Sequence, residues 1–164
     1  MSAEDLEYQV GVLLTQMGLS LAVAESCSGG LLSHLITNVP GSSVYYLGGI
    51  ISYANETKIN ILGVTQSTLE RYGAVSRETA LEMARGARLL LAADISLSTT
   101  GIAGPGGGTP QKPVGLTWIG LSSQDYESAR QFMWQGDRLA VKQQTAKQAL
   151  RILLDFLNRI SPGV

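Results

Sequence analysis

The chain has 164 residues, of which 45% are hydrophobic and 15% charged, and its formal net charge is −1. This composition is typical of one folded domain and excludes a disordered polar chain. Binding to nucleic acid through phosphate contacts requires clustered Lys and Arg side chains. The sequence contains no basic cluster, so we expect no nucleic-acid partner.

The sequence also indicates the cellular compartment in which the protein is found. The single cysteine, Cys27, has no second cysteine for an internal disulfide, which fits a reducing environment. The first residues are acidic and polar, unlike a signal peptide. No apolar stretch approaches the roughly 18 residues of a membrane span. We therefore expect a cytoplasmic protein with no membrane partner.

The first half of the chain alternates helical and strand patterns. Apolar residues at helical spacing predict a helix over 3–17 that Gly18 ends. The apolar run over 21–24 predicts a strand, which is followed by a polar, Gly-rich turn. Patterns of the same kind predict, in chain order, a helix from 31 to before Pro40, a strand over 44–54, a short helix over 55–62, a helical turn over 64–70 and a helix over 76–92.

Capping residues mark the starts of these helices. Asn55 or Asn60 is expected to open the short helix, and Thr65 or Ser67 the helical turn after it. Ser76 begins a loose capping box, because Thr79 occupies the position where Glu is usual.

The second half of the chain is richer in strands. Alternation predicts a strand over 94–100 that runs into the Gly-rich turn 101–108, and further strands over 114–121 and 128–134. A final helix is expected over 138–157, with Asp137 as its N-cap. The βα alternation followed by a hairpin predicts a single three-layer α/β/α domain over 1–164, with a mixed, mostly parallel sheet.

Two Gly-rich turns follow predicted strands, where α/β sheets bind ligands. The turn over 25–30 places Ser26, Cys27 and Ser28 at a helix start, so each serine is either an N-cap or a nucleophile. The turn over 101–108 is either a surface loop or a cradle of backbone amides for an oxygen of the ligand. Neither turn matches a Walker loop or G-x-G-x-x-G.

The sequence narrows the choice of general base. His34 is the only histidine, and it lies two helical turns beyond Ser26, too far for a Ser-His-Asp triad. No Cys/His or acidic cluster has metal-ligand spacing, so we expect no metal and no cofactor. The base is then expected to be a lysine or a tyrosine, which directs attention to Tyr53 and Lys58 at the end of a predicted strand. Lys58 is either a desolvated base or a solvated lysine paired with Glu56, and spacing does not join it to Ser26.

Taken together, these segments resemble the CinA C-terminal domain family, which includes stand-alone nicotinamide-nucleotide amidases. The resemblance extends over nearly the whole chain. Its motifs follow the family order: A-E-S-C-S-G-G at 24–30, G-I-I-S-Y-A-N-E-T-K at 49–58, G-V at 63–64, G-A-V-S at 73–76, T-G-I-A-G-P-G-G-G at 100–108, K-P-V-G at 112–115 and G-D-R at 136–138.

The resemblance implies a metal-free hydrolase that converts nicotinamide mononucleotide into nicotinic acid mononucleotide and ammonia, in the recycling of NAD. Ser26 fills the family's serine position, whereas at Ser28 the family also accepts threonine, which favours Ser26 as nucleophile. Tyr53 and Lys58 fall on the family's Tyr and Lys positions and are expected to move the proton.

The resemblance also suggests roles around the reacting groups. Backbone amides of Ser28, Gly29 and Gly30 are expected to stabilise the oxyanion. Glu25 is either a counter-charge for Lys58 or the pyridinium, or an acid at a helix end. The remaining residues expected to bind the nucleotide substrate are Thr100, Gly101, Ala103, Gly104 and, as a fork-shaped phosphate ligand, Arg138.

Two other functions remain open from the sequence. One is a catalytically quiet domain that binds a pyridine nucleotide, and the other is an interaction protein associated with competence or DNA damage. The apolar, aromatic run over 44–47 is either a half-buried strand or part of a contact between subunits, and we expect a homo-oligomer.

Overall fold

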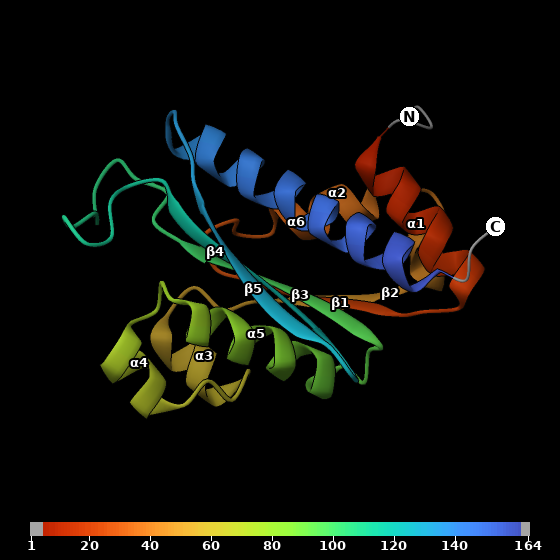
Figure 1. Ribbon diagram of the computed structural model, residues 1–164, viewed down its shortest axis with the longest axis horizontal. Coiled ribbons are helices and arrows are strands. Elements are labelled where there is room, and N and C mark those ends of the chain that lie inside the picture. Colours follow the sequence, from red (N-terminus) through yellow and green to blue (C-terminus); the bar gives the residue numbers. More distant parts are fainter. Residues whose placement is uncertain (1–4, 162–164) are drawn as a thin grey trace.

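The computed structural model describes residues 5–161, which form one five-stranded sheet with helices on both faces (Figure 1). The strands are β1 (Leu21–Glu25), β2 (Tyr46–Ile51), β3 (Ile95–Gly101), β4 (Leu116–Ser123) and β5 (Glu127–Met133). The helices are α1 (Leu6–Met17), α2 (Leu31–Thr37), the 3₁₀ helix η1 (Ser42–Val44), α3 (Asn55–Asn60), α4 (Gln66–Tyr72), α5 (Arg77–Leu90) and α6 (Arg138–Ile160).

The strand order is β2-β1-β3-β4-β5. β1 pairs in parallel with both β2 and β3, whereas β4 is antiparallel to β3 and β5 is antiparallel to β4. Four of the five strands therefore run in the same direction. This arrangement confirms the prediction of a mixed, mostly parallel sheet.

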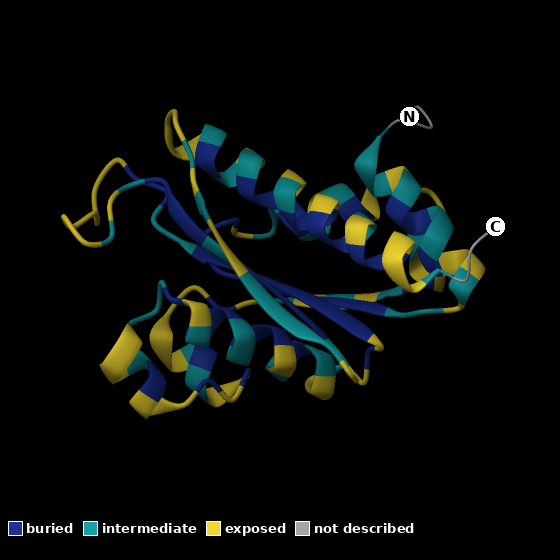
Figure 2. Ribbon diagram, in the orientation of Figure 1, coloured by how far each residue is buried: buried dark blue, intermediate teal, exposed yellow. Residues whose placement is uncertain are grey.

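The helices form the two outer layers. α1, α2 and α6 cover one face of the sheet, and α3, α4 and α5 cover the other, which confirms the three-layer prediction (Figure 1). The helix sides that face the sheet are buried and their outer sides are exposed (Figure 2). None of the described helices combines the length and apolar character that crossing a membrane requires.

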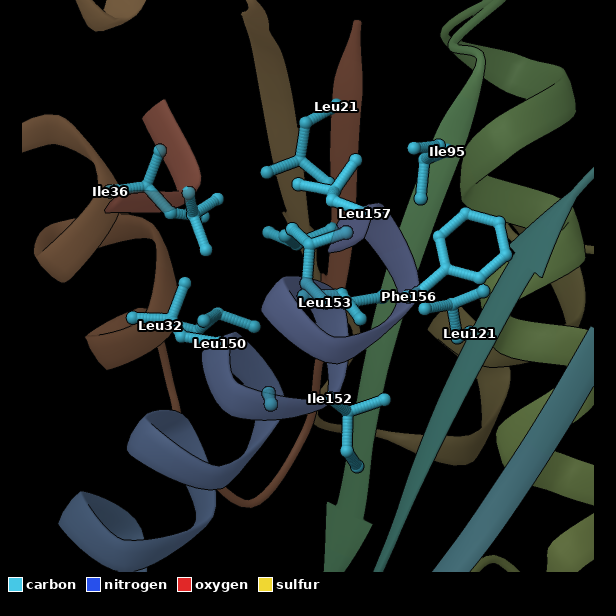
Figure 3. Packing of buried hydrophobic residues seen from close by; sticks show 14 of the residues in the cluster. Leu21, Leu32, Ile36, Ile95, Leu121, Leu150, Ile152, Leu153, Phe156 and Leu157 are labelled. Carbon is cyan, nitrogen blue, oxygen red and sulfur yellow. The ribbon is translucent and has the colours of Figure 1, made fainter. Parts of the chain in front are cut away.

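A hydrophobic cluster fills the space on each face of the sheet. Leu21 and Val23 of β1 belong to the larger cluster, under α6, where side chains of α2 and α6 such as Leu32 and Leu153 meet the strands (Figure 3). The intervening residues of β1, Ala22 and Ala24, face the smaller cluster under α5. Because β1 is buried on both faces, its sequence is a continuous apolar run rather than an alternating one.

Several predicted helix ends are confirmed. Gly18 ends α1 with a left-handed φ of 64°. The side chains of Thr65, Ser76 and Asp137 accept hydrogen bonds from the amides of Thr68, Thr79 and Ala140, so they cap α4, α5 and α6. The Ser76 cap works with Thr79 at the third position, because Ser76 Oγ accepts from the backbone amide of Thr79; Ser76 Oγ also donates to the Thr79 hydroxyl at 3.0 Å.

Two predictions around β2 were wrong. The strand expected over 44–54 is shorter, because the chain first turns at Gly41, with φ 82°, and forms η1. Neither Asn55 nor Asn60 caps α3, since the N-cap is Ala54, whose side chain cannot accept a hydrogen bond. Instead, Lys58 of α3 bonds to the carbonyl oxygens of the two residues that follow β2.

Candidate active site

The candidate site lies where the parallel strands β1, β2 and β3 end. Loops follow these strands at one edge of the sheet, and the longest, between β3 and β4, projects beyond it (Figure 1). A pocket of about 280 Å³ opens among them. Its walls include these residues that the sequence predicts as site residues: Ser26, Tyr53, Lys58, Thr100, Gly101, Ala103, Gly104 and Arg138.

Ser26 and Lys58 meet in the wall of this pocket. Lys58 Nζ lies 3.1 Å from Ser26 Oγ, although 32 residues separate them in the sequence. Ser26 is fixed by its amide, which donates to the carbonyl oxygen of Thr99 at 2.9 Å. The hydroxyl is therefore held against an amine at a distance suited to proton transfer.

Lys58 Nζ has three hydrogen-bond partners in its surroundings. The side chain is only 1% exposed. Besides Ser26, Nζ contacts the carbonyl oxygen of Ser52 at 2.7 Å and that of Tyr53 at 3.2 Å. A neutral amine has two N–H bonds and one lone pair. Directed at the two carbonyls, the two N–H bonds leave the lone pair for the Ser26 proton.

Burial also shifts the pKa values of Lys58, which contacts Ser26, and of Cys27, the next residue in the chain. Desolvation lowers the pKa of Lys58 below 10.5, because removal from water disfavours the ammonium form. Desolvation raises the pKa of the Cys27 thiol to about 12. Cys27 is therefore a protonated, unreactive thiol. The amine that contacts Ser26 loses its proton more readily than an exposed lysine does.

Glu25 accepts hydrogen bonds from the turn and from α2 and does not line the pocket. Its carboxylate is fully buried and accepts from the amides of Gly30, Leu32 and Ser33, and from the hydroxyls of Ser28 and Ser33. Of the two roles considered for Glu25, the structure shows the acid at a helix end. It does not contact Lys58 or line the pocket.

These contacts separate the two candidate nucleophiles. The Ser28 hydroxyl is fully buried, donates to Glu25 at 2.6 Å and lies 2.6 Å from the hydroxyl of Thr99. It is outside the pocket wall. Of the two serines, only Ser26 combines a place in the pocket with contact to a base.

The glycine amides expected to stabilise an oxyanion already have partners. Gly29 donates to the carbonyl oxygen of Ser26, and Gly30 donates to Glu25. These two amides stabilise the turn itself, and their use as oxyanion donors stays a prediction. Within residues 5–161 the amides of Cys27 and Ser28 donate to no backbone carbonyl oxygen, and Cys27 also lines the pocket.

Tyr53 and Arg138 close the outer side of the pocket. Arg138 donates from Nη2 to the Tyr53 hydroxyl at 2.6 Å and from Nη1 to the carbonyl oxygen of Gly104 at 2.8 Å. Tyr53 contacts Lys58 through its backbone oxygen, and the residue as a whole is 60% exposed. The guanidinium thus ties α6 to the loops after β2 and β3.

The loop after β3 forms the remaining wall. The Thr100 hydroxyl is buried and donates to the carbonyl oxygen of Ala74, which attaches the segment before α5 to the end of β3. Gly104 precedes a cis peptide bond to Pro105 and has φ 83°, a backbone conformation that suits glycine. Within residues 5–161, no group of His, Cys, Asp and Glu side chains is arranged to hold a metal ion.

Sequence patterns did not reveal some residues of the site. The carbonyl oxygens of Ser52 and Tyr53 accept hydrogen bonds from Lys58. Every residue type has a backbone carbonyl, so the sequence gives no signal for such an acceptor. Ala74 and Val75 also line the pocket, and their place in the G-A-V-S motif at 73–76 was the available signal.

Comparison with known proteins places the chain among relatives of the same architecture. The model of the CinA C-terminal domain family matches residues 3–157. A CinA-like protein of Chloroherpeton thalassium is 48% identical over 157 residues, which is 93% of this chain. The chain spans about 37% of the length of the curated relatives it matches.

Solved structures agree in fold. A competence-damaged protein (CinA) superfamily protein of Klebsiella pneumoniae has a TM-score of 0.92 and 30% identity, covering 97% of this chain and 99% of that one. A competence/damage inducible protein of Agrobacterium tumefaciens has a TM-score of 0.89 and 37% identity, covering 96% of this chain and 99% of its own.

Proposed function

The chain belongs to the CinA C-terminal domain family, and from this premise we propose that it is a nicotinamide-nucleotide amidase with Ser26 as nucleophile. In this proposal it hydrolyses nicotinamide mononucleotide to nicotinic acid mononucleotide and ammonia. The observation that carries the proposal is the buried contact of 3.1 Å between Lys58 Nζ and Ser26 Oγ in the wall of a pocket. A hydroxyl beside a desolvated amine is suited to acyl transfer.

The first half-reaction forms an ester. Ser26 Oγ bonds to the carboxamide carbon while its proton passes to Lys58 Nζ. The tetrahedral intermediate then collapses and its C–N bond breaks. The leaving nitrogen takes a proton from Lys58, directly or through the Tyr53 hydroxyl. That hydroxyl accepts from Arg138 and keeps its own O–H for donation.

The second half-reaction releases the acid. Water attacks the nicotinoyl ester and gives a proton to neutral Lys58, and Ser26 leaves with a proton returned from the same amine. In both half-reactions, negative charge develops on the former carbonyl oxygen. The amides of Cys27 and Ser28, which donate to no backbone carbonyl oxygen, are the donors we propose for that charge, the first because it follows the nucleophile directly.

An ammonia-release assay with nicotinamide mononucleotide tests the proposal. We expect release by the wild type, and a loss of at least about 10³-fold in Ser26→Ala and of about 10²- to 10⁴-fold in Lys58→Met. Ser67→Ala, at an exposed position on α4, is the matched control and keeps full activity. Full activity in Ser26→Ala would contradict the assignment of the nucleophile.

The same assay separates the proposal from its alternative. A domain that only binds a pyridine nucleotide releases no ammonia in any variant but still binds the nucleotide in calorimetry. The relatives' names refer to competence and damage and do not describe a reaction.

The proposal includes the setting in which the enzyme works. We propose a cytoplasmic homo-oligomer whose partner is its small-molecule substrate. The unpaired, buried Cys27 and exposed apolar side chains on and beside the edge strand β2, such as Val44 and Leu47, support this part. Sedimentation velocity tests the oligomer, and a single monomer peak at micromolar concentration would contradict it.

A further inference from the structure

A second pocket adjoins the catalytic one. It has a volume of about 500 Å³ and shares Ala103 and Arg138 with the catalytic pocket. Pro105 and Val114 supply apolar wall from the loop between β3 and β4, and α6 supplies Lys142. The two pockets together offer room for a ligand much larger than a pyridine carboxamide.

Lys142 connects the second pocket with the loop that carries Ser26. A Cβ placed on Gly29 would lie 3.5 Å from Lys142 Nζ, so the ammonium group rests against this loop. The side chain is half-buried, and within residues 5–161 it makes no hydrogen bond or ion pair. A partly desolvated ammonium without an acceptor is costly, and an anion bound beside it offsets that cost.

The other charged groups of this pocket are already engaged. Arg138 directs its terminal nitrogens at Gly104 and Tyr53, and Asp137 accepts from the amide of Ala140 as the cap of α6. Within the part of the chain that the structure describes, Lys142 is therefore the cation of this wall that makes no hydrogen bond, whereas Arg138 uses two of its five N–H donors. Arg138, which the sequence predicts as a phosphate ligand together with the loop after β3, directs two of its N–H bonds at Gly104 and Tyr53.

We propose that Lys142 binds the phosphate group of the substrate in this second pocket and is a specificity-determining residue; this inference rests on the proposed amidase function. A phosphate monoester carries a charge of about −1.5 to −2 at pH 7 and three acceptor oxygens. The pyridine amide then lies at Ser26 and the phosphate at Lys142. The enzyme selects pyridine nucleotides over the corresponding nucleosides.

The experiment compares kcat/KM for nicotinamide mononucleotide and for nicotinamide riboside, which lacks the phosphate. In Lys142→Gln we expect the ratio of the two values to fall by about 10- to 100-fold, mainly through a higher KM for the nucleotide. Lys142→Arg keeps the charge and most of the ratio. Lys147→Gln removes the same charge from an exposed position on α6 and leaves the ratio unchanged.

Other outcomes separate this inference from the proposed function. An unchanged ratio in Lys142→Gln, with normal ammonia release, overturns the inference and leaves the amidase proposal standing. An equal loss with both substrates also overturns it, because that result indicates a structural role. If the wild type releases no ammonia, the affinity for nicotinamide mononucleotide is measured by calorimetry. Weaker binding by Lys142→Gln but not by Lys147→Gln supports the inference. Equal affinity of the wild type and Lys142→Gln overturns it.

Discussion

At the scale of single residues, the protonation of Lys58 governs the candidate chemistry. Its nitrogen meets two carbonyl oxygens and one hydroxyl, so the ammonium and the neutral amine are both fully hydrogen bonded. The proton can therefore move between Lys58 and Ser26 with no rearrangement of side chains. Burial lowers the pKa of Lys58 and so favours its neutral amine form.

This bias predicts a pH profile. A base must be neutral to accept a proton, so kcat/KM for nicotinamide mononucleotide rises with pH and levels off above the lowered pKa of Lys58. The midpoint is expected below 10.5, the ordinary value. Steady-state rates between pH 5 and 10 measure it. An activity that falls with increasing pH over this range would show that the charged form of Lys58 is the active one.

The site residues differ in how far the sequence predicts them. Ser26, Tyr53 and Lys58 follow from the strand-turn pattern and the family motifs, and the structure brings all three to one pocket. The role of Glu25 could not be read from spacing. A carboxylate before a helix can face a ligand or cap the helix, and the fold of the turn decides which.

At the scale of elements, Glu25 joins β1 to α2. It is the last residue of β1, and its two oxygens accept five hydrogen bonds from the turn and the first residues of α2. The short helix has no side-chain cap on its N-cap residue, Gly30. One buried carboxylate thus fixes the direction in which the chain leaves Ser26.

Replacing this carboxylate tests that role. In Glu25→Gln an amide N–H₂ faces backbone N–H donors, so we expect a loss of about 2–4 kcal/mol in the free energy of unfolding. Urea unfolding followed by circular dichroism measures it. Glu70→Gln changes an exposed carboxylate on α4 and costs less than about 0.5 kcal/mol. Equal stability of the two variants would rule out the capping role.

Helix α5 depends on a close backbone contact. A Cβ at Gly86 would lie 1.9 Å from the carbonyl oxygen of Leu62, in the segment that follows α3. We expect Gly86→Ala to lose about 1–3 kcal/mol in thermal or urea unfolding, because the clash outweighs the better helix propensity of alanine. Arg77→Ala, at an exposed position of the same helix, is the control. A stabilised Gly86→Ala protein would mean that α5 can move away from Leu62.

The elements themselves were largely predictable. Periodicity located α1, α5 and α6, an apolar run located β1 and alternation located β3, because these patterns reflect the faces that pack in the sheet. The boundaries near β2 were not predictable. The turn at Gly41 and the anchoring of α3 by Lys58 depend on contacts between distant segments, which no local pattern records.

At the scale of the whole molecule, the buried amine links stability to pH. The pKa of Lys58 is lower in the folded protein than in the unfolded chain, so the unfolded chain binds more protons between the lowered value and 10.5. Stability therefore rises with pH in that window and is lost as pH falls through it. The raised pKa values of Cys27, Tyr45 and Tyr46, all caused first by desolvation, act in the opposite direction at high pH.

A comparison of variants isolates this contribution. The difference in free energy of unfolding between the wild type and Lys58→Met is expected to shift in favour of the wild type as pH rises toward 10.5. Cys27 and the tyrosines are present in both proteins, so their effects cancel to first order. Urea titrations at several pH values measure the difference. A difference that is constant with pH would show that Lys58 keeps its ordinary pKa when the protein folds.

The contact of Arg138 with Tyr53 and Gly104 also has a consequence for biosynthesis. The ribosome releases Ser26 and Lys58 long before the start of α6, so a growing chain carries the reacting pair before it has the residue that ties the surrounding loops. Lys142 follows later still. The complete pocket therefore forms only after α6 has been made and has packed on α1 and α2.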